Sequence, residues 1–243
     1  ATGSQLARRE ALECERQVLN LNLGPEISAQ WRVGDIHVRV QLPEPSSPSS
    51  PVSSSTSGNI PEDAPAEGER CCVEFDIRTF QCGPAVSSAT SLTSSPASTP
   101  CASPKHATLP TIVLIHGMTE GIPFYARLMA HLAPFARVLA LDLPGMGLSQ
   151  FPDLPKGYES KWKSVEAETF FVHSIDAWLT EILPPEENGN VYMVGHSFGG
   201  YIAMVYAMTF PSRVRKLFLL SPMLGFRDKE ALLSAGGKFQ NLA

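Results

Sequence analysis

The sequence lacks the features that indicate a nucleic-acid, metal or nucleotide partner. Its formal net charge is only −5 over 243 residues and its basic residues are scattered, whereas nucleic-acid-binding proteins carry clustered basic patches. It contains no C-x-x-C, H-E-x-x-H or P-loop pattern, so the residues give no support to haem, zinc or nucleotide binding. We therefore expect no cofactor, no metal site and no nucleic-acid partner.

A disulfide framework and long apolar runs are also missing. The five cysteines are an odd number and include the adjacent pair Cys71 and Cys72, which is unlike the frameworks of small secreted proteins. The apolar runs Thr111–Ile115 and Leu217–Leu220 are far shorter than the roughly 18 residues that a spanning helix needs. The first ten residues contain neither an initiator Met nor the apolar core of a signal peptide. We expect a soluble, cytoplasmic protein, and the true termini stay open.

Two segments have low complexity. Residues 43–70 and 83–109 are dominated by Ser, Pro, Thr and Ala. Such segments cannot bury enough apolar surface to offset the entropy of ordering. We predict that both are disordered insertions in a single domain that spans residues 1–243.

The remaining sequence indicates an α/β protein. A helix over residues 6–19 precedes two strand-like alternations at 31–42 and 73–82, which we expect to form an antiparallel pair. Continuous apolar runs then alternate with helical patterns, which is typical of a mostly parallel sheet with helices on both faces. The strands are "TIVLIHG", "RVLALDL", "VYMVGHS" and "VRKLFLLSP", and the helices lie around 124–132, 164–183 and 198–210.

The first of these helices has a regular apolar spacing. Phe124, Leu128, His131 and Leu132 occupy positions i, i+4, i+7 and i+8 and therefore share one face. We predict that His131 is a partly buried packing residue on that face.

The sequence "GHSFGG" places Ser197 between an apolar strand and a helical run. This is the context that the G-x-S-x-G nucleophile motif requires, because a strained strand-to-helix turn leaves no room for side chains at Gly195 and Gly199. The backbone N–H of Phe198 would then point at a developing oxyanion. Ser197 is therefore the candidate nucleophile, with His196 beside it as a supporting residue.

The loop after the strand "TIVLIHG" is the expected source of a second oxyanion donor. It leaves the same edge of the sheet, which would place the backbone N–H of Met118 near Ser197. His116 could be mistaken for the catalytic base. We expect instead that it hydrogen-bonds locally and, with Gly117, holds this loop.

Three motifs together resemble the α/β-hydrolase superfamily. "IHGM" resembles its oxyanion loop, "DLPGMGLS" (Asp142–Ser149) its D-x-x-G-x-G-x-S turn, and "GHSFGG" its nucleophile elbow. The resemblance covers Pro110–Phe226. It implies the α/β-hydrolase fold, of which this chain would hold only the N-terminal portion.

A narrower resemblance concerns "REALECERQVL" and the stretch from "HSFGGYIAMVYAM" to "SPMLGF". These are similar to the subfamily of the adipose triglyceride lipase co-activator, N-acyl-phosphatidylethanolamine lipase and related lysophosphatidic acid acyltransferases. The mammalian co-activator has asparagine where this chain has Ser197, which favours catalysis here. This N-terminus shows no tryptophan-rich lipid-droplet anchor, so the resemblance does not imply attachment to droplets through such an anchor.

The partners of Ser197 are missing from the expected order. In this fold the nucleophile is followed by Asp or Glu and then by His, yet all six histidines precede Ser197. Asp228 is a weak candidate for the acid. We expect the chain to be the N-terminal part of a longer enzyme, with a lid region beginning at residues 223–243, and to be inactive by itself.

The resulting hypothesis is a serine hydrolase or acyltransferase acting on acyl esters of lipids or lysophospholipids. Its partners would be an acyl substrate and, through peripheral association, lipid droplets, mitochondria or the endoplasmic reticulum. Two alternatives stay open. One is a proline-iminopeptidase-like serine peptidase, and the other is a non-catalytic lipase co-activator or binding protein.

Overall fold

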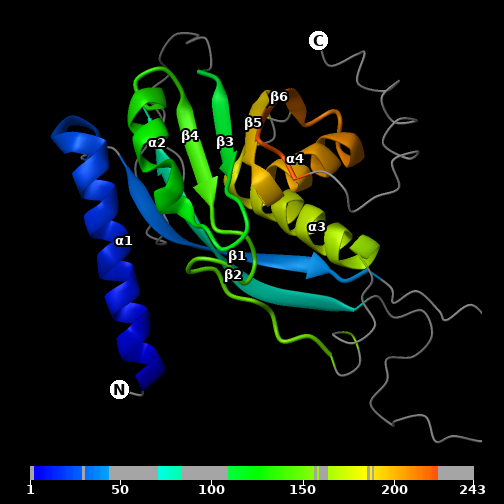
Figure 1. The fold of residues 1–243 in the computed structure, drawn as a ribbon. Helices are drawn as coiled ribbons and strands as arrows, with labels where there is room; N and C mark the ends of the chain where they lie inside the picture. The colour runs from blue at the N-terminus through cyan, green and yellow to red at the C-terminus, as the bar shows by residue number, and fades with distance from the viewer. Residues whose placement is uncertain are drawn as a thin grey trace, which may run out of the picture.

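The computed structural model describes residues 3–28, 31–43, 71–83, 109–155, 158, 164–184, 187 and 189–223. Nearly all of the predicted insertions at 43–70 and 83–109, and of the lid region at 223–243, lie outside these residues. The elements in chain order are α1 (Gly3–Ser28), β1 (Arg32–Gln41), β2 (Cys72–Cys82), β3 (Thr111–Ile115), the 3₁₀ helix η2 (Ile122–Tyr125), α2 (Ala126–Leu132), β4 (Arg137–Leu141), α3 (Ser164–Ile182), β5 (Val191–His196), α4 (Ser197–Thr209) and β6 (Val214–Leu220) (Figure 1).

The strands form one sheet in the order β1-β2-β4-β3-β5-β6. β1 pairs with β2, and β2 with β4, in antiparallel fashion. The other neighbours are parallel. The expected N-terminal antiparallel pair and the mostly parallel sheet are therefore confirmed. Because Ile115 of β3 lies opposite Gly195 of β5, the carboxyl ends of these strands meet at one edge.

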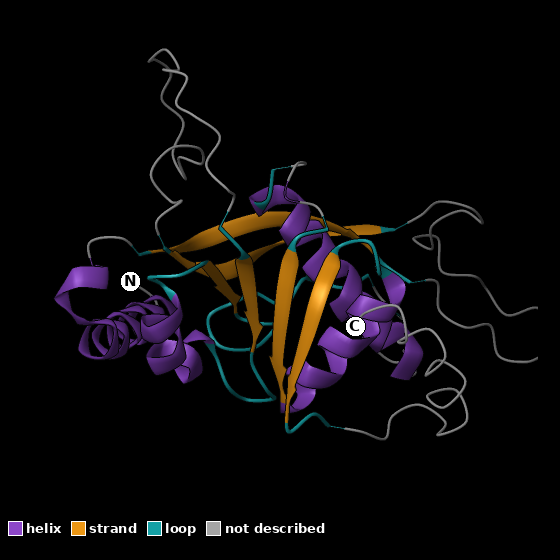
Figure 2. Ribbon diagram, turned by 90° about the horizontal axis from the view of Figure 1, so that it is seen from above, coloured by secondary structure: helices purple, strands orange, loops and turns teal. Residues whose placement is uncertain are grey.

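Helices cover both faces of the sheet, with α1 and α2 on one side and α3 and α4 on the other (Figure 2). The alternation of side chains along each strand produces the two cores. In β3, Val113 and Ile115 pack into the core beneath α3 and α4. Leu114, between them, packs into the core beneath α1 and α2. Continuous apolar runs are therefore required in the central strands β3 and β4, whose side chains are buried on both faces of the sheet.

The buried face of α2 differs from the sequence prediction. His131 is exposed, and its Nδ1 lies 2.7 Å from the carbonyl oxygen of Arg127. Phe124 is also half exposed. The buried residues of this segment are Ile122, Tyr125, Ala126, Met129 and Ala133, and the predicted Leu128 and Leu132 are partly buried against the same core. The prediction is therefore confirmed for Leu128 and Leu132 and wrong for Phe124 and His131. Phe124 belongs to a 3₁₀ turn over residues 122–125, whose tighter winding departs from the spacing of a continuous α-helix.

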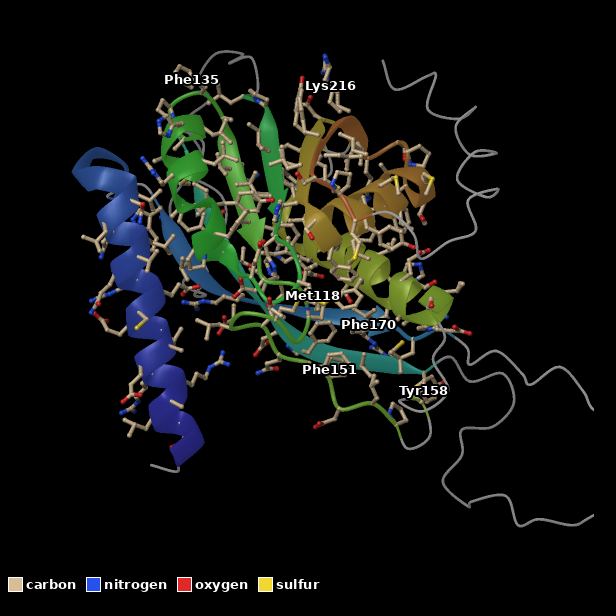
Figure 3. The ribbon with its side chains drawn as sticks, in the orientation of Figure 1. Met118, Phe135, Phe151, Tyr158, Phe170 and Lys216 are labelled. Atoms are coloured by element: carbon tan, nitrogen blue, oxygen red, sulfur yellow. The ribbon has the colours of Figure 1, made fainter. Side chains whose placement is uncertain are left out.

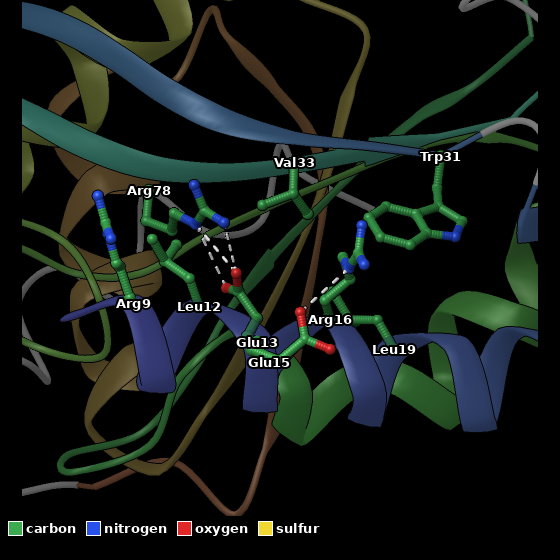
Figure 4. Close-up of a pocket in the computed structure, with 9 residues that line it drawn as sticks. All are labelled: Arg9, Leu12, Glu13, Glu15, Arg16, Leu19, Trp31, Val33 and Arg78. Carbon is green, nitrogen blue, oxygen red and sulfur yellow. Dashed lines mark hydrogen bonds and ion pairs between the residues drawn. The ribbon is translucent and has the colours of Figure 1, made fainter. Parts of the chain in front are cut away.

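The helix α1 begins before and ends after its predicted range, and its inner side closes a cavity of about 460 Å³ against β1 and β2 (Figure 4). Arg78 of β2 points into this interface. Its Nη2 donates to Oε2 of Glu15 at 2.6 Å and its Nη1 to Oδ1 of Asp35 at 3.2 Å. Burial raises the pKa of Glu15, against the pull of Arg78. The cavity is lined by Arg9, Leu12, Glu13, Glu15, Arg16, Leu19, Trp31, Val33 and Arg78.

This buried ion pair predicts a strong effect of Arg78→Met. The Glu15 side chain is only 4% exposed, so removing the guanidinium leaves a buried carboxyl without its partner. We expect the free energy of unfolding to fall by about 3 kcal/mol, as measured by urea denaturation. Arg8→Met is the matched control, because Arg8 pairs with Asp35 at the surface and such pairs contribute about 1 kcal/mol or less. Equal losses in the two variants would contradict the prediction.

Within the described ranges, no helix is both long enough and apolar enough to cross a membrane.

Candidate active site

Ser197 lies where β5 ends and α4 begins, at the edge to which the parallel strands point. Its φ is +50°, in the left-handed region that residues other than glycine rarely adopt. Backbone strain of this kind costs on the order of 1–3 kcal/mol and persists only where the surroundings enforce it. The side chain is half-buried. A strained serine at a strand-to-helix turn is the geometry in which a nucleophile is held out from a sheet.

Two glycines beside Ser197 are required by close backbone contacts. A Cβ at Gly195 would lie 2.5 Å from the carbonyl oxygen of Gly199. A Cβ at Gly199 would lie 2.2 Å from the carbonyl oxygen of His116 and 2.4 Å from that of Ile115. The first turn of α4 therefore rests directly on the end of β3. This contact places the loop that follows β3 next to Ser197.

The loop after β3 lies against Ser197. A Cβ at Gly117 would be 3.1 Å from Cβ of Ser197 and 3.1 Å from Nδ1 of His196. Met118 follows directly, with its side chain 49% exposed, beyond the carboxyl ends of the strands (Figure 3). The residues named from the sequence as oxyanion and supporting residues are thus gathered around the turn. Phe198 follows Ser197 in the first turn of α4.

His116 is fully buried and both of its ring nitrogens are engaged. Its Nδ1 lies 2.7 Å from the carbonyl oxygen of Gly117, and its Nε2 accepts from the backbone N–H of Leu143 at 2.9 Å. Burial lowers the pKa of His116, which favours the neutral ring that this pattern needs. His116 therefore ties the loop to the turn after β4 and has no nitrogen free for Ser197.

Asp142, in the turn after β4, holds two loops at the same edge. Its Oδ1 accepts from the N–H of Ile122 at 2.6 Å, and its Oδ2 from the N–H of Leu148 at 2.7 Å. Gly147 has a φ of +54°, and a Cβ there would lie 2.2 Å from Oδ2 of Asp142. This explains the aspartate and glycine of the D-x-x-G-x-G-x-S turn. Burial raises the pKa of Asp142 to about 6.

The raised pKa predicts a pH dependence of stability. The folded state holds the Asp142 proton more tightly than the unfolded chain does, whose carboxyl has the ordinary value of 3.8. The contribution of Asp142 is therefore fully present below pH 3.8 and is lost as the pH rises through about 6. Asp142→Asn does not titrate. We expect the stability of the wild type relative to this variant to fall by about 2 kcal/mol between roughly pH 4 and 7. Parallel curves of unfolding free energy against pH would refute this.

The acid and base partners are not brought together with Ser197 in the described part of the chain. No hydrogen bond joins a histidine side chain to the Ser197 hydroxyl among these residues. Asp228, the weak acid candidate, lies outside them. The described residues also contain no group of three His, Cys, Asp or Glu side chains that could hold a metal ion.

Two residues that the sequence analysis missed lie beside the turn. Oε2 of Glu120 accepts from the N–H of Gly117 at 2.7 Å and lies 3.1 Å from Nδ1 of His196. The Phe124 ring stacks on His196, with centroids 4.7 Å apart and planes at 23°. Neither contact has a local signal, because His196 is 76 positions from Glu120 in the sequence.

Comparisons with known proteins agree with this geometry. A family model described as "alpha/beta hydrolase fold" matches residues 110–241, which is more than half of the chain. Abhydrolase domain-containing protein abhd-5.2 of Caenorhabditis elegans is 39% identical over 119 residues, covering 49% of this chain and 24% of that protein. A probable 1-acylglycerol-3-phosphate O-acyltransferase of Oryza sativa subsp. japonica is 36% identical over 114 residues, covering 46% of this chain and 25% of that protein.

Among solved structures, naproxen esterase from Bacillus subtilis has a TM-score of 0.52 at 14% identity, covering 98% of this chain and 57% of that chain. That likeness concerns the fold alone. The chain spans about a quarter of the length of the two relatives. The resemblance inferred from the three sequence motifs is confirmed over the matched range.

Proposed function

Because the chain belongs to the α/β-hydrolase fold family, we propose that Ser197 is the nucleophile of an enzyme that hydrolyses or transfers acyl esters. The observation that carries the proposal is the left-handed backbone of Ser197 at the β5–α4 turn. A serine with a purely structural role would not need this strained backbone, whereas the same turn exposes the hydroxyl of a nucleophile at the edge of the sheet. The loop of Gly117 and Met118 packed against the turn supports the same role.

The reaction follows from this arrangement. A base takes the proton of Ser197, the Oγ attacks the ester carbonyl, and the tetrahedral oxyanion collapses with release of the alcohol. The backbone N–H groups of Met118 and Phe198 stabilise the oxyanion. Water or an acceptor alcohol then releases the acyl group from Ser197. Gly195 and Gly199 permit the turn, while His116, Gly117 and His196 support the loop and the turn.

The base and acid are proposed to come from parts of the protein beyond the described residues. All six histidines of this chain precede Ser197, so the catalytic histidine is assigned to a longer protein. Asp228 remains a weak candidate for the acid. On this proposal, the chain by itself has no hydrolase activity.

The substrate is proposed to be an acyl ester of a lipid or lysophospholipid. The rice relative, which is similar to 46% of this chain, is named as a probable acyltransferase of 1-acylglycerol-3-phosphate. Met118 in the loop and Phe124 in η2 are each about half exposed. Apolar side chains at this position would contact an acyl chain. Peripheral association with a membrane or lipid droplet is part of the same proposal.

The test uses the whole protein that contains this chain. Ser197 should be the residue that reacts covalently with a fluorophosphonate probe, as located by peptide mass spectrometry. The whole protein should act on lysophospholipid esters and leave amides of N-terminal proline uncleaved. Faster cleavage of the proline amides would favour a serine peptidase. Absence of both labelling and turnover would favour a non-catalytic co-activator and contradict the proposal.

A further inference from the structure

We propose that Glu120 is a positioning residue that ties the loop of the oxyanion donors to the nucleophile turn. The inference rests on the proposed role of Ser197. Glu120 belongs to none of the motifs that identify the fold, and it lies three residues after Gly117 in the loop.

The tie depends on one carboxylate oxygen. Oε2 of Glu120 accepts from the backbone N–H of Gly117 at 2.7 Å and from Nδ1 of His196 at 3.1 Å. Gly117 belongs to the loop after β3, whereas His196 is the last residue of β5 and directly precedes Ser197. A single acceptor atom therefore joins the two backbone segments whose separation determines how the oxyanion donors face the serine.

His196 is held on a second side as well. The Phe124 ring stacks on the imidazole at 4.7 Å between centroids. Phe124 belongs to η2, which is itself fixed through the bond from Ile122 N–H to Asp142. The imidazole of His196 is thus held by the Phe124 ring stacked on its face and by the Glu120 carboxylate at its Nδ1. The Glu120 and His196 side chains are only 24% and 26% exposed, so water competes weakly for these bonds.

The bond from Gly117 N–H to Glu120 gives the backbone amides of Gly117 and Met118 different roles. The N–H of Gly117 already donates to Glu120 and is not available to an oxyanion. The following amide, that of Met118, is left as the donor of this loop. Without Glu120, the N–H of Gly117 would lose its acceptor at a half-buried position, and the loop could turn that amide toward the serine instead. The position of the Met118 amide would then no longer be fixed.

The first experiment measures hydrolysis of p-nitrophenyl butyrate by the whole protein. Glu120→Ala should lower kcat by about 50-fold with KM changed by less than about threefold, because misplacing a donor by about 1 Å costs up to 10²-fold. Glu120→Gln should retain kcat within about threefold of the wild type, because its amide oxygen can accept the same two bonds. Asp153→Ala is the control, since it removes an exposed carboxylate from another loop.

The outcomes distinguish a positioning role of Glu120 from an effect of its negative charge and from an effect on folding. A kcat of Glu120→Ala close to that of the wild type would overturn the proposal. Equal losses in Glu120→Ala and Glu120→Gln would also overturn it, because the negative charge would then matter rather than the tie. A loss of activity that follows a lowered Tm below the assay temperature would reduce Glu120 to a folding role.

A second experiment does not depend on turnover. Hydrogen exchange of the Gly117 amide should be about tenfold faster in Glu120→Ala than in the wild type and unchanged in Glu120→Gln. Unchanged exchange in Glu120→Ala would overturn the tie itself. If the wild type neither turns over substrate nor reacts with a fluorophosphonate, the proposed function fails, whereas the exchange result still decides whether Glu120 holds the loop.

Discussion

Gly199→Ala should lower the free energy of unfolding by more than about 4 kcal/mol, which is exceptional for one methyl group. The added Cβ would lie 2.2 Å from the carbonyl oxygen of His116 and 2.4 Å from that of Ile115. Both obstacles are backbone atoms at the end of β3, so neither can rotate away. Relief would require α4 to move off the sheet or β3 to separate from β5.

The neighbouring glycine provides the control. A Cβ at Gly200 would meet its nearest atoms at 3.0 and 3.1 Å, so small shifts can accommodate it. Gly200→Ala should cost about 1–2 kcal/mol. Urea denaturation measures both variants, and thermal melting tests whether Gly199→Ala folds at all. Equal stabilities of the two variants would contradict the steric argument.

Ser197→Ala should lower kcat of the whole protein by on the order of 10⁶. The substitution removes only the hydroxyl group, and without it no acyl-enzyme can form. Steady-state hydrolysis of the lysophospholipid substrate measures the effect. Residual activity within about tenfold of the wild type would rule out Ser197 as the nucleophile.

Ser197→Gly distinguishes the effect of backbone strain on stability from the effect of the hydroxyl on activity at the same position. Glycine adopts the φ of +50° without the steric penalty of a Cβ. This variant should lose activity as completely as Ser197→Ala but gain about 1 kcal/mol of stability over it. A variant with alanine that is as stable as the one with glycine would show that the backbone at this turn is not strained.

The sequence predicted the elements whose signal is local and strong. β3 and β5 are short apolar runs buried on both faces, and the glycines at 195 and 199 identify the turn from β5 to α4. The packing of Phe124 was predicted wrongly because a 3₁₀ turn before Ala126 cannot be recognised from apolar spacing.

The part of the site that the sequence did not predict depends on tertiary contacts. Glu120 and Phe124 matter through His196, which belongs to a distant strand. No periodicity or motif links these three positions. The D-x-x-G-x-G-x-S turn was recognised by resemblance, and its physical basis, two backbone amides held by Asp142, required coordinates.

The register of the sheet also determines where the protein can tolerate change in length. Gly83 directly follows β2, and a Cβ there would lie 2.3 Å from the carbonyl oxygen of Ala136, just before β4 begins. β3 begins nearby, since Arg137 N–H donates to the carbonyl oxygen of Pro110. Both attachment points of the Ser- and Thr-rich connection between β2 and β3 therefore lie at the edge opposite Ser197. Lengthening or shortening that connection, whether by evolution or by inserting a reporter domain, would leave the chemistry at the other edge undisturbed.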